Sequence, residues 1–258
     1  MMINPKDNVM AVPEGSIAVV GIGPGDYEGM TIRAARILEA CDVIIGYTLY
    51  IELIRTHFPG KEMLTTPMRR EKERCILALK EAAKGRQVAV VCSGDGGIYG
   101  MAGLLLEIRA ASEAWQGIPV SVIPGVTAAI SGAAILGAPL MGDFAVISLS
   151  DLLVPWETIE KRLRGAAASD LTICLYNPGS HKRTDHLQRA CRICLEFLSP
   201  QTVCGVARNI GRDGQETLLM SLEELAAYPA DMFSTIFIGN SRTQNLCGQM
   251  VTGRGYEL

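Results

Sequence analysis

The stretch from Val88 to Gly100, VAVVCSGDGGIYG, constrains the fold of this chain most strongly. Its first five residues, Val88 to Cys92, are apolar and rich in β-branched side chains, which predicts a short buried strand. Glycines then interrupt the run, and a Leu-rich segment after Gly100 predicts a helix. Such a strand exposes backbone at the carboxyl edge of a sheet, where open α/β sheets bind ligands. The alternative is a tight turn without a ligand, and the motif alone favours neither.

The same alternation of strands and helices runs along the whole chain and predicts an α/β fold with mainly parallel sheets. It pauses at Gly137 to Asp143, where we place a domain boundary. We therefore expect a flexible arm over residues 1–14, an N-terminal α/β domain over 15–138 and a C-terminal α/β domain over 143–258. The expected strands are 16–20, 42–46, 88–92, 119–123, 144–150, 171–177, 202–209, 216–220 and 234–240. The expected helices include 32–41, 47–58, 69–84, 127–136, 156–168, 184–197 and 221–228.

Charge and hydropathy exclude several classes of protein. The net charge of −3 gives no reason to expect nucleic acid or an anionic membrane as a partner. No apolar run reaches the ~18 residues that a membrane-spanning helix needs. The first residues also lack the apolar core of a signal peptide, so we expect a cytoplasmic protein.

The glycine-rich segment GIGPGD superficially resembles a dinucleotide-binding fingerprint. Its glycines fall at positions 21, 23 and 25, and Asp26 stands where the G-x-G-x-x-G pattern requires a glycine. The acidic residue expected after the second strand is also missing. Binding of a nicotinamide or flavin cofactor is therefore disfavoured.

The sequence contains few residues that could form a metal site or a catalytic triad. Cys191 and Cys194 form a C-x-x-C pair in a predicted helix, with no second pair at zinc spacing, and are expected to share a packed face. No protein-bound metal is predicted. Of three histidines, His181 is the most informative because Lys182 and Arg183 follow it. This cluster could bind carboxylates or phosphates, or it could be a solvated basic loop.

Three further pairs of residues lie at or just beyond the carboxyl ends of predicted strands or turns. Each pair alone is a turn, but together they supply polar groups from both halves of the chain. This pattern suggests one ligand held in a cleft between two domains. The pairs are Thr127-Ala128, Tyr176-Asn177 and Ala207-Arg208.

The order of these motifs resembles that of the tetrapyrrole methylase family, and in particular its precorrin-3B C17-methyltransferase branch with the cobalt-factor III counterpart. The resemblance covers residues 15–243. It implies two α/β domains, a homodimer, and S-adenosylmethionine bound between the domains. The motifs that carry it are GIGPGD at Gly21, SGDGGIYGMAG at Ser93, IPGVTA at Ile123, SLSD and PWE between Ser148 and Glu157, YNPGSHKR at Tyr176 and IFIGNSRT at Ile236.

The resemblance also assigns roles to residues of this chain. It implies that the first glycine-rich loop faces the tetrapyrrole, with Gly23, Pro24, Tyr99, Lys182 and Arg183 against the substrate. It implies a cofactor pocket formed by Pro24, Ser93, Gly94, Asp95, Ile98, Thr127, Ala128, Tyr176, Asn177, Ala207 and Arg208.

The implied reaction is methylation of C17 coupled to ring contraction, with closure of a δ-lactone from a ring A acetate. Some relatives carry an acidic residue after the second strand, proposed as a base, whereas this chain has Tyr47 there. Tyr47 is therefore a candidate for proton handling or substrate orientation, although it could equally pack against the macrocycle, and His181 is a second candidate. Alternatives are another precorrin C-methyltransferase of the same fold, or a non-catalytic tetrapyrrole-binding protein. The sequence leaves open whether the substrate contains cobalt.

Overall fold

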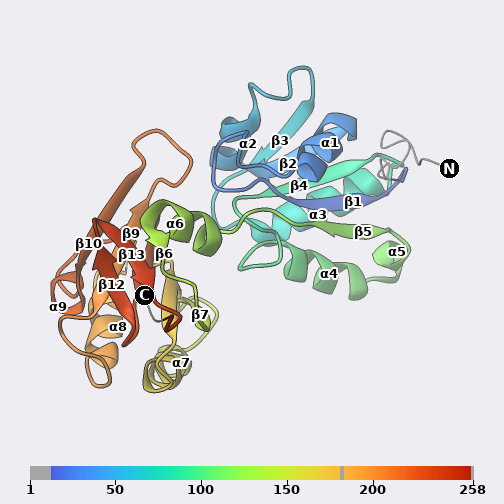
Figure 1. Ribbon diagram of the computed structural model, residues 1–258. Coiled ribbons are helices and arrows are strands. Elements are labelled where there is room, and N and C mark those ends of the chain that lie inside the picture. The colour runs from blue at the N-terminus through green and yellow to red at the C-terminus, as the bar shows by residue number, and fades with distance from the viewer. Residues whose placement is uncertain (1–12, 181–182, 257–258) are drawn as a thin grey trace. The chain divides into compact units, whose positions relative to one another are not determined.

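The computed structural model describes residues 13–180 and 183–256, and these divide into two compact units between Thr127 and Ala128 (Figure 1). Most of the expected N-terminal arm lies outside the described residues. The division also falls earlier than the expected boundary at 138–143, because helix α6 (Ala128–Leu136) belongs to the second unit. Its small residues fit closely on that unit's sheet: a Cβ added to Gly132 would lie 3.0 Å from the ring of Phe237.

The first unit is built on a five-stranded sheet in the order β3-β2-β4-β1-β5, and all of its neighbouring strands are parallel. Parallel register brings the carboxyl ends of all five strands to one edge of the sheet. The expected strands are confirmed, and β3 is an addition that the sequence pattern did not single out. The strands are β1 (Ile17–Gly21), β2 (Val43–Tyr47), β3 (Glu62–Thr66), β4 (Val88–Cys92) and β5 (Val120–Ile123).

Helices cover both faces of this sheet, as its continuous apolar strands require. Ala18 and Val20 of β1 pack towards α1 (Ile32–Ala40) and α2 (Thr48–Ile54). Ile17 and Val19 point the opposite way, towards α3 (Glu71–Ala82) and α4 (Ala102–Ala110), which precedes the short α5 (Glu113–Gln116). The unit is therefore a three-layer α/β/α structure.

The ends and faces of these helices follow from the local sequence. Thr31 caps α1, because its Oγ1 accepts the Ala34 N–H at 3.1 Å. The buried face of α3 contains Cys75, Ala78, Leu79 and Ala82, which recur at helical spacing.

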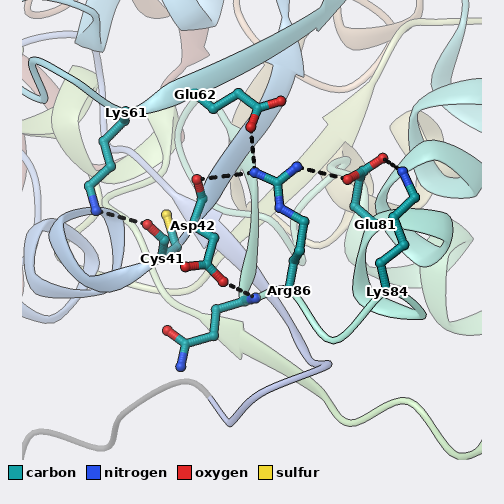
Figure 2. Close-up of polar contacts among 8 residues, drawn as sticks. Cys41, Asp42, Lys61, Glu62, Glu81, Lys84 and Arg86 are labelled. Carbon is teal, nitrogen blue, oxygen red and sulfur yellow. Dashed lines mark hydrogen bonds and ion pairs between the residues drawn. The ribbon is translucent and has the colours of Figure 1, made fainter.

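Charged side chains fasten the amino edge of the same sheet (Figure 2). Arg86, which precedes β4, donates to Glu81 at 2.8 Å and to Glu62 at 2.5 Å. Lys84 pairs with the second carboxylate oxygen of Glu81 at 2.6 Å, and Asp42 accepts the Gln87 N–H at 2.7 Å. These contacts join the amino ends of β2, β3 and β4 to the end of α3, opposite the edge where the strands finish.

The second unit contains a five-stranded sheet in the order β10-β9-β11-β8-β7. Here the expectation of a mainly parallel sheet is wrong, because β7–β8 is parallel and the other three pairs are antiparallel. Strand β11 is antiparallel to both β8 and β9, so β7, β8 and β9 still end at a common edge. The strands are β7 (Phe144–Ser148), β8 (Thr172–Tyr176), β9 (Val203–Arg208), β10 (Glu216–Ser221) and β11 (Ser234–Ile238).

Helices α7 (Trp156–Ala168), α8 (His186–Cys194) and α9 (Leu222–Leu225) pack on one face of this sheet. Cys191 and Cys194 are fully buried in that core, which confirms the packed-face interpretation of the C-x-x-C pair. Helix α6 covers the other face together with Met250. A small sheet that the sequence did not predict joins β6 (Gly137–Ala138) to the hairpin of β12 (Thr243–Leu246) and β13 (Gln249–Thr252). No helix within the described ranges is long and apolar enough to span a bilayer.

Candidate functional site

The loops after β1 and β4 meet where these two strands end. Gly23 donates its N–H to the Gly94 carbonyl at 3.1 Å, and Gly94 returns a hydrogen bond to the Gly23 carbonyl at 2.7 Å. Gly94 adopts a positive φ of 66°, which favours glycine. The two glycine-rich motifs of the sequence are therefore one structure, held together through their backbones.

Close packing explains the glycines on either side of this bridge. A Cβ added to Gly21 would lie 2.6 Å from the Gly94 carbonyl oxygen, and one added to Gly125 would lie 2.1 Å from the same atom. Real Cβ atoms do not approach backbone this closely. The three chain segments that leave β1, β4 and β5 therefore touch without any space for side chains between them.

Asp95 joins two of these loops. Its Oδ1 accepts the Gly97 N–H at 2.7 Å, and its Oδ2 accepts the Gly125 N–H at 3.0 Å. The carboxylate thus ties the loop after β4 to the loop after β5. Each oxygen has a further lone pair, so the expected ligand contact, in which Asp95 would accept a hydrogen bond, remains a prediction alongside this structural role.

Beyond Gly97 the loop presents side chains to the outside. Ile98 is 41% exposed and Tyr99 is 56% exposed, with Tyr99 at a positive φ of 51°. Pro24 is half-buried in the loop after β1, while Thr127 is buried where the first unit ends. These residues give the edge an apolar and aromatic surface next to exposed backbone.

Tyr47 lies at the end of β2, on the same edge of the first sheet. It is half-buried, and its ring packs edge-on against Tyr50 at 5.2 Å between centroids. The hydroxyl role predicted for Tyr47 is untested by this geometry. The position nevertheless agrees with the expectation that Tyr47 follows the second strand.

In the second unit, Tyr176 and Asn177 stand at the end of β8. The Tyr176 hydroxyl accepts the Ala129 N–H at 2.6 Å, at the start of α6. Asn177, at a positive φ of 54°, donates its Nδ2 to Ser148 Oγ at 2.9 Å. Ser148 was part of a motif in the sequence, but nothing there indicated that it would orient Asn177.

Arg208 ends β9, and its guanidinium forms a salt bridge of 2.9 Å with Asp231. Partial burial raises the pKa of the Asp231 carboxyl, but hydrogen bonds from Arg208 and Ser234 outweigh that effect and leave the pKa below its ordinary value. Asp231 was missed in the sequence because it lies in a loop 23 residues from Arg208. Ala207 is fully buried and offers its backbone in β9.

The basic cluster after β8 is only partly described. Arg183 is half-buried and donates from Nη1 to Ser150 Oγ at 3.2 Å, which links the loops after β8 and β7. His181 and Lys182 lie outside the described residues. The candidate roles of these two side chains therefore stay predictions.

The expected site residues fall into two groups, one in each unit. Most of them lie where parallel-running strands end, whereas Ala128 is the first residue of α6. The groups offer backbone N–H groups, a carboxamide, phenols and guanidinium groups, which suit a polar organic ligand that carries carboxylates. In the described parts of the chain, no three His, Cys, Asp or Glu side chains gather as a metal site would require. The first group is Gly23, Pro24, Tyr47, Ser93, Gly94, Asp95, Ile98, Tyr99 and Thr127, and the second is Ala128, Tyr176, Asn177, Arg183, Ala207 and Arg208.

In this chain, a parallel α/β unit with interlocked glycine loops is followed by a unit with a mixed sheet. The profile of the "Tetrapyrrole (Corrin/Porphyrin) Methylases" matches residues 16–226, and the chain therefore belongs to that family. Among its relatives is a "Probable cobalt-factor III C(17)-methyltransferase" of Salmonella typhimurium, 45% identical over 242 residues, which are 94% of this chain and 100% of that protein. The resemblance inferred from the motifs is thereby confirmed.

Solved structures agree with this assignment. The crystal structure of the methyltransferase CobJ superimposes with a TM-score of 0.87 at 36% identity, covering 93% of this chain and 100% of that one. A uroporphyrin-III C-methyltransferase from Thermus thermophilus, solved in complex with S-adenosylhomocysteine, has the same fold, with a TM-score of 0.67 at 20% identity over 87% of this chain and 97% of that one. The α/β class and the tetrapyrrole methylase fold are confirmed.

Proposed function

We propose that this chain is an S-adenosylmethionine-dependent methyltransferase that methylates C17 of cobalt-factor III or precorrin-3B, with ring contraction, in cobalamin biosynthesis. The observation that carries the proposal is the 45% identity over the full length of the Salmonella C17-methyltransferase. The alignment covers 94% of this chain and 100% of that protein, so the similarity includes both units.

The described residues fit the cofactor. The adenosine and amino-acid parts of S-adenosylmethionine need apolar surface, hydrogen-bond donors and acceptors, and close approach to backbone. The loop after β4 provides all of these through Gly97, the exposed Ile98 and the outer lone pairs of Asp95. In the second unit, Asn177 and the backbone of Ala207 would contact the same ligand. When bound, the cofactor supplies an electrophilic methyl group.

The protein's own contribution to methyl transfer is alignment. A sulfonium methyl group needs a nucleophilic carbon placed in line with it, and fixed positioning can supply a large part of the rate acceleration. The interlocked backbones at Gly21, Gly94 and Gly125 give such a rigid base. Arg183 and Lys182 bind substrate carboxylates, and Tyr47 orients the macrocycle or handles a proton.

Calorimetry with S-adenosylhomocysteine and NAD⁺ tests the class of cofactor. We expect S-adenosylhomocysteine to bind with a dissociation constant on the order of micromolar and NAD⁺ to show no heat of binding. The reverse result, or no binding of either, would contradict the methyltransferase assignment.

Mass spectrometry of the product, after incubation with each substrate in turn, tests the reaction. Methylation at C17 with ring contraction of cobalt-factor III, of precorrin-3B or of both would support the proposal and define the natural substrate. Methylation at another carbon would make the chain a different precorrin methyltransferase. Binding of the tetrapyrrole without turnover would make it a non-catalytic binding protein.

Replacement of Tyr47 by Phe tests its hydroxyl. If the hydroxyl handles a proton, kcat falls while the KM for the tetrapyrrole stays within about twofold of the wild-type value. Unchanged turnover would leave Tyr47 with a packing role only. Sedimentation of the purified protein tests the further proposal of a homodimer, and fractionation of cells tests the proposed cytoplasmic location.

A further inference from the structure

Two loops at the carboxyl edge of the second sheet are joined by contacts between their side chains. We call residues 149–155, after β7, the first loop, and the described residues 177–180 and 183–185, after β8, the second loop. Ser150 of the first loop accepts a hydrogen bond from Arg183 of the second at 3.2 Å. Asp151 of the first loop lies 3.2 Å from Nε2 of His186, where α8 begins directly after the second loop.

His186 is the buried centre of this connection. Its side chain is only 7% exposed, and each ring nitrogen lies 3.2 Å from a carboxylate oxygen, Nε2 from Asp151 and Nδ1 from Asp185. The edge of its ring meets Trp156 at 5.1 Å, and the Arg189 guanidinium covers the Trp156 ring at 3.9 Å. The imidazole is therefore held on all of these sides and cannot swing away without loss of packing.

Nε2 of His186 and the Asp151 carboxylate lie 3.2 Å apart, but Nε2 forms no aligned hydrogen bond with any of the described residues. The two groups attract each other as an ion pair when the imidazole is protonated. The interaction with His186 nevertheless lowers the pKa of the Asp151 carboxyl. Moving Asp151 away would leave the buried Nε2 without a polar neighbour, which is unfavourable, so His186 and Asp151 restrain each other.

Arg183 gains a defined position from this arrangement. Its backbone pairs with Ser180 through two hydrogen bonds of 3.0 Å, and its Nη1 reaches Ser150, the neighbour of Asp151. Its Nε is buried without a hydrogen-bond partner in the described part of the chain. A guanidinium fixed in this way presents its remaining donors as a rigid fork, which matches a carboxylate.

We propose that His186 is a positioning residue: through Asp151 it fixes the first loop, and the first loop sets Arg183 to bind a carboxylate of the tetrapyrrole. The inference rests on the proposed function for the identity of the ligand. It adds to that function the residues that decide how the substrate's acidic side chains are held. The polar chain continues from Ser150 through Ser148 to Asn177, so the same loops connect the expected substrate and cofactor contacts.

The first experiment measures tetrapyrrole KM and kcat for His186→Gln and Asp151→Asn. The matched control is Glu196→Gln, which removes a carboxylate that pairs with Arg164 on the surface of the same unit. We expect each of the first two variants to raise KM on the order of tenfold, the effect of one weakened contact to a charged group, with kcat within about twofold. The control should leave both constants unchanged, and all variants should bind S-adenosylhomocysteine as the wild type does.

A double-mutant cycle tests whether His186 acts through Arg183. Once Arg183 is replaced by Gln, the change His186→Gln should alter KM by less than about twofold further. Additive effects of the two changes would overturn the proposal, because His186 would then contribute independently of Arg183. A wild-type KM for both His186→Gln and Asp151→Asn would overturn it as well.

A second measurement needs no substrate. In protein labelled with ¹⁵N-arginine, exchange of the Arg183 Nε–H with water should be slow and should accelerate on the order of tenfold in Asp151→Asn. Equal rates in the variant and the wild type would show that the loops do not fix Arg183. If the wild-type protein failed to bind any tetrapyrrole while these exchange rates differed, the proposed function would fail but the positioning of Arg183 would stand.

Discussion

Asp95→Ala gives the most direct test of how the glycine loops of the first unit are held. The variant removes the acceptor of two backbone N–H groups, that of Gly97 at 2.7 Å and that of Gly125 at 3.0 Å. A hydrogen bond to a charged group contributes about 1.5–3 kcal/mol when it is buried. Gly97 is exposed, so water replaces that bond in part, whereas the bond to Gly125 is partly buried. We therefore expect the free energy of unfolding to fall by about 2–3 kcal/mol.

The two tryptophans allow the first unit to be followed by itself. Trp115 belongs to α5 in the first unit, and Trp156 begins α7 in the second. In a Trp156→Phe background, the fluorescence of Trp115 during urea denaturation reports on the first unit alone. With a typical urea dependence of ~2 kcal/mol per molar, the expected loss lowers the midpoint by roughly 1 M.

Asp26→Ala is the matched control for Asp95→Ala. Asp26 also accepts a glycine N–H, that of Gly29 at 2.7 Å, but the bond is exposed and stays within one loop, so its loss should cost less than about 1 kcal/mol. An Asp95→Ala variant that unfolds at the wild-type midpoint would refute the structural role. Weaker binding of S-adenosylhomocysteine, on the order of tenfold, would add the predicted ligand contact. Lower stability with unchanged affinity would leave Asp95 as a link between loops only.

Three further predictions concern packing, charge and thiols. Gly125→Ala should destabilise the first unit by several kcal/mol in the same denaturation assay, since its Cβ would lie 2.1 Å from a carbonyl oxygen. Gly103→Ala in α4 of the same unit, with open space around it, should gain up to about 1 kcal/mol, and equal effects would contradict the close packing. Arg86→Met should cost about 1–2 kcal/mol at neutral pH because Glu81 loses one of two partners. The pKa of Glu81 is lowered in the folded chain. The stability difference between the wild type and Arg86→Met should therefore be fully present above the ordinary pKa of 4.5 and should disappear as the pH falls through the lowered pKa. A stability difference that grows in acid would refute the pairing. Titration with a thiol reagent should find one fast cysteine of eight, Cys247, and a second fast thiol would contradict the burial of the others.

The sequence predicted the first unit better than the second. In the first unit, hydrophobic runs alternate regularly with amphipathic segments, and a parallel sheet follows from that alternation. The second unit shows the same alternation up to β9, but the strands Glu216–Ser221 and Ser234–Ile238 are separated by only a short helix and a turn. Strand direction depends on these connections rather than on the residues of a strand, so the antiparallel pairs were not visible.

The domain boundary was misplaced for a related reason. The segment Gly137 to Asp143 looked like a linker because it breaks the pattern, yet Gly137–Ala138 pairs in parallel with β13, which lies more than 100 residues later. That pairing cannot be inferred from local composition. Likewise, the small residues of α6 favour close packing, but they do not indicate which sheet the helix covers.

The sequence predicted those site residues that lie at the end of a strand, but it did not predict the residues with which they form hydrogen bonds and salt bridges. Asn177 and Arg208 follow apolar runs, so their place at a sheet edge is a local property of the sequence. Ser148, at the end of β7, and Asp231, in a loop, orient them from 29 and 23 residues away. Such pairings depend on how the loops fold back, and no spacing rule encodes that. The same holds for Asp151 and His186.

The glycines of the Val88–Gly100 stretch are present for different reasons. Gly94 adopts a positive φ of 66°, a Cβ on Gly96 would lie 2.8 Å from Val19, and one on Gly100 would lie 2.5 Å from the Gly96 carbonyl oxygen. Backbone conformation and packing therefore account for these three. Gly97 is exposed, and a Cβ there would meet only the carboxylate of Asp95 at 3.2 Å. A ligand is therefore needed to explain only the outer part of the loop. The ligand contacts are therefore expected at Asp95 and at the exposed side chains after Gly97. Bound S-adenosylhomocysteine should protect amides from hydrogen exchange at residues 98–100 rather than at Gly94 and Gly97, whose N–H groups already donate hydrogen bonds in the free protein.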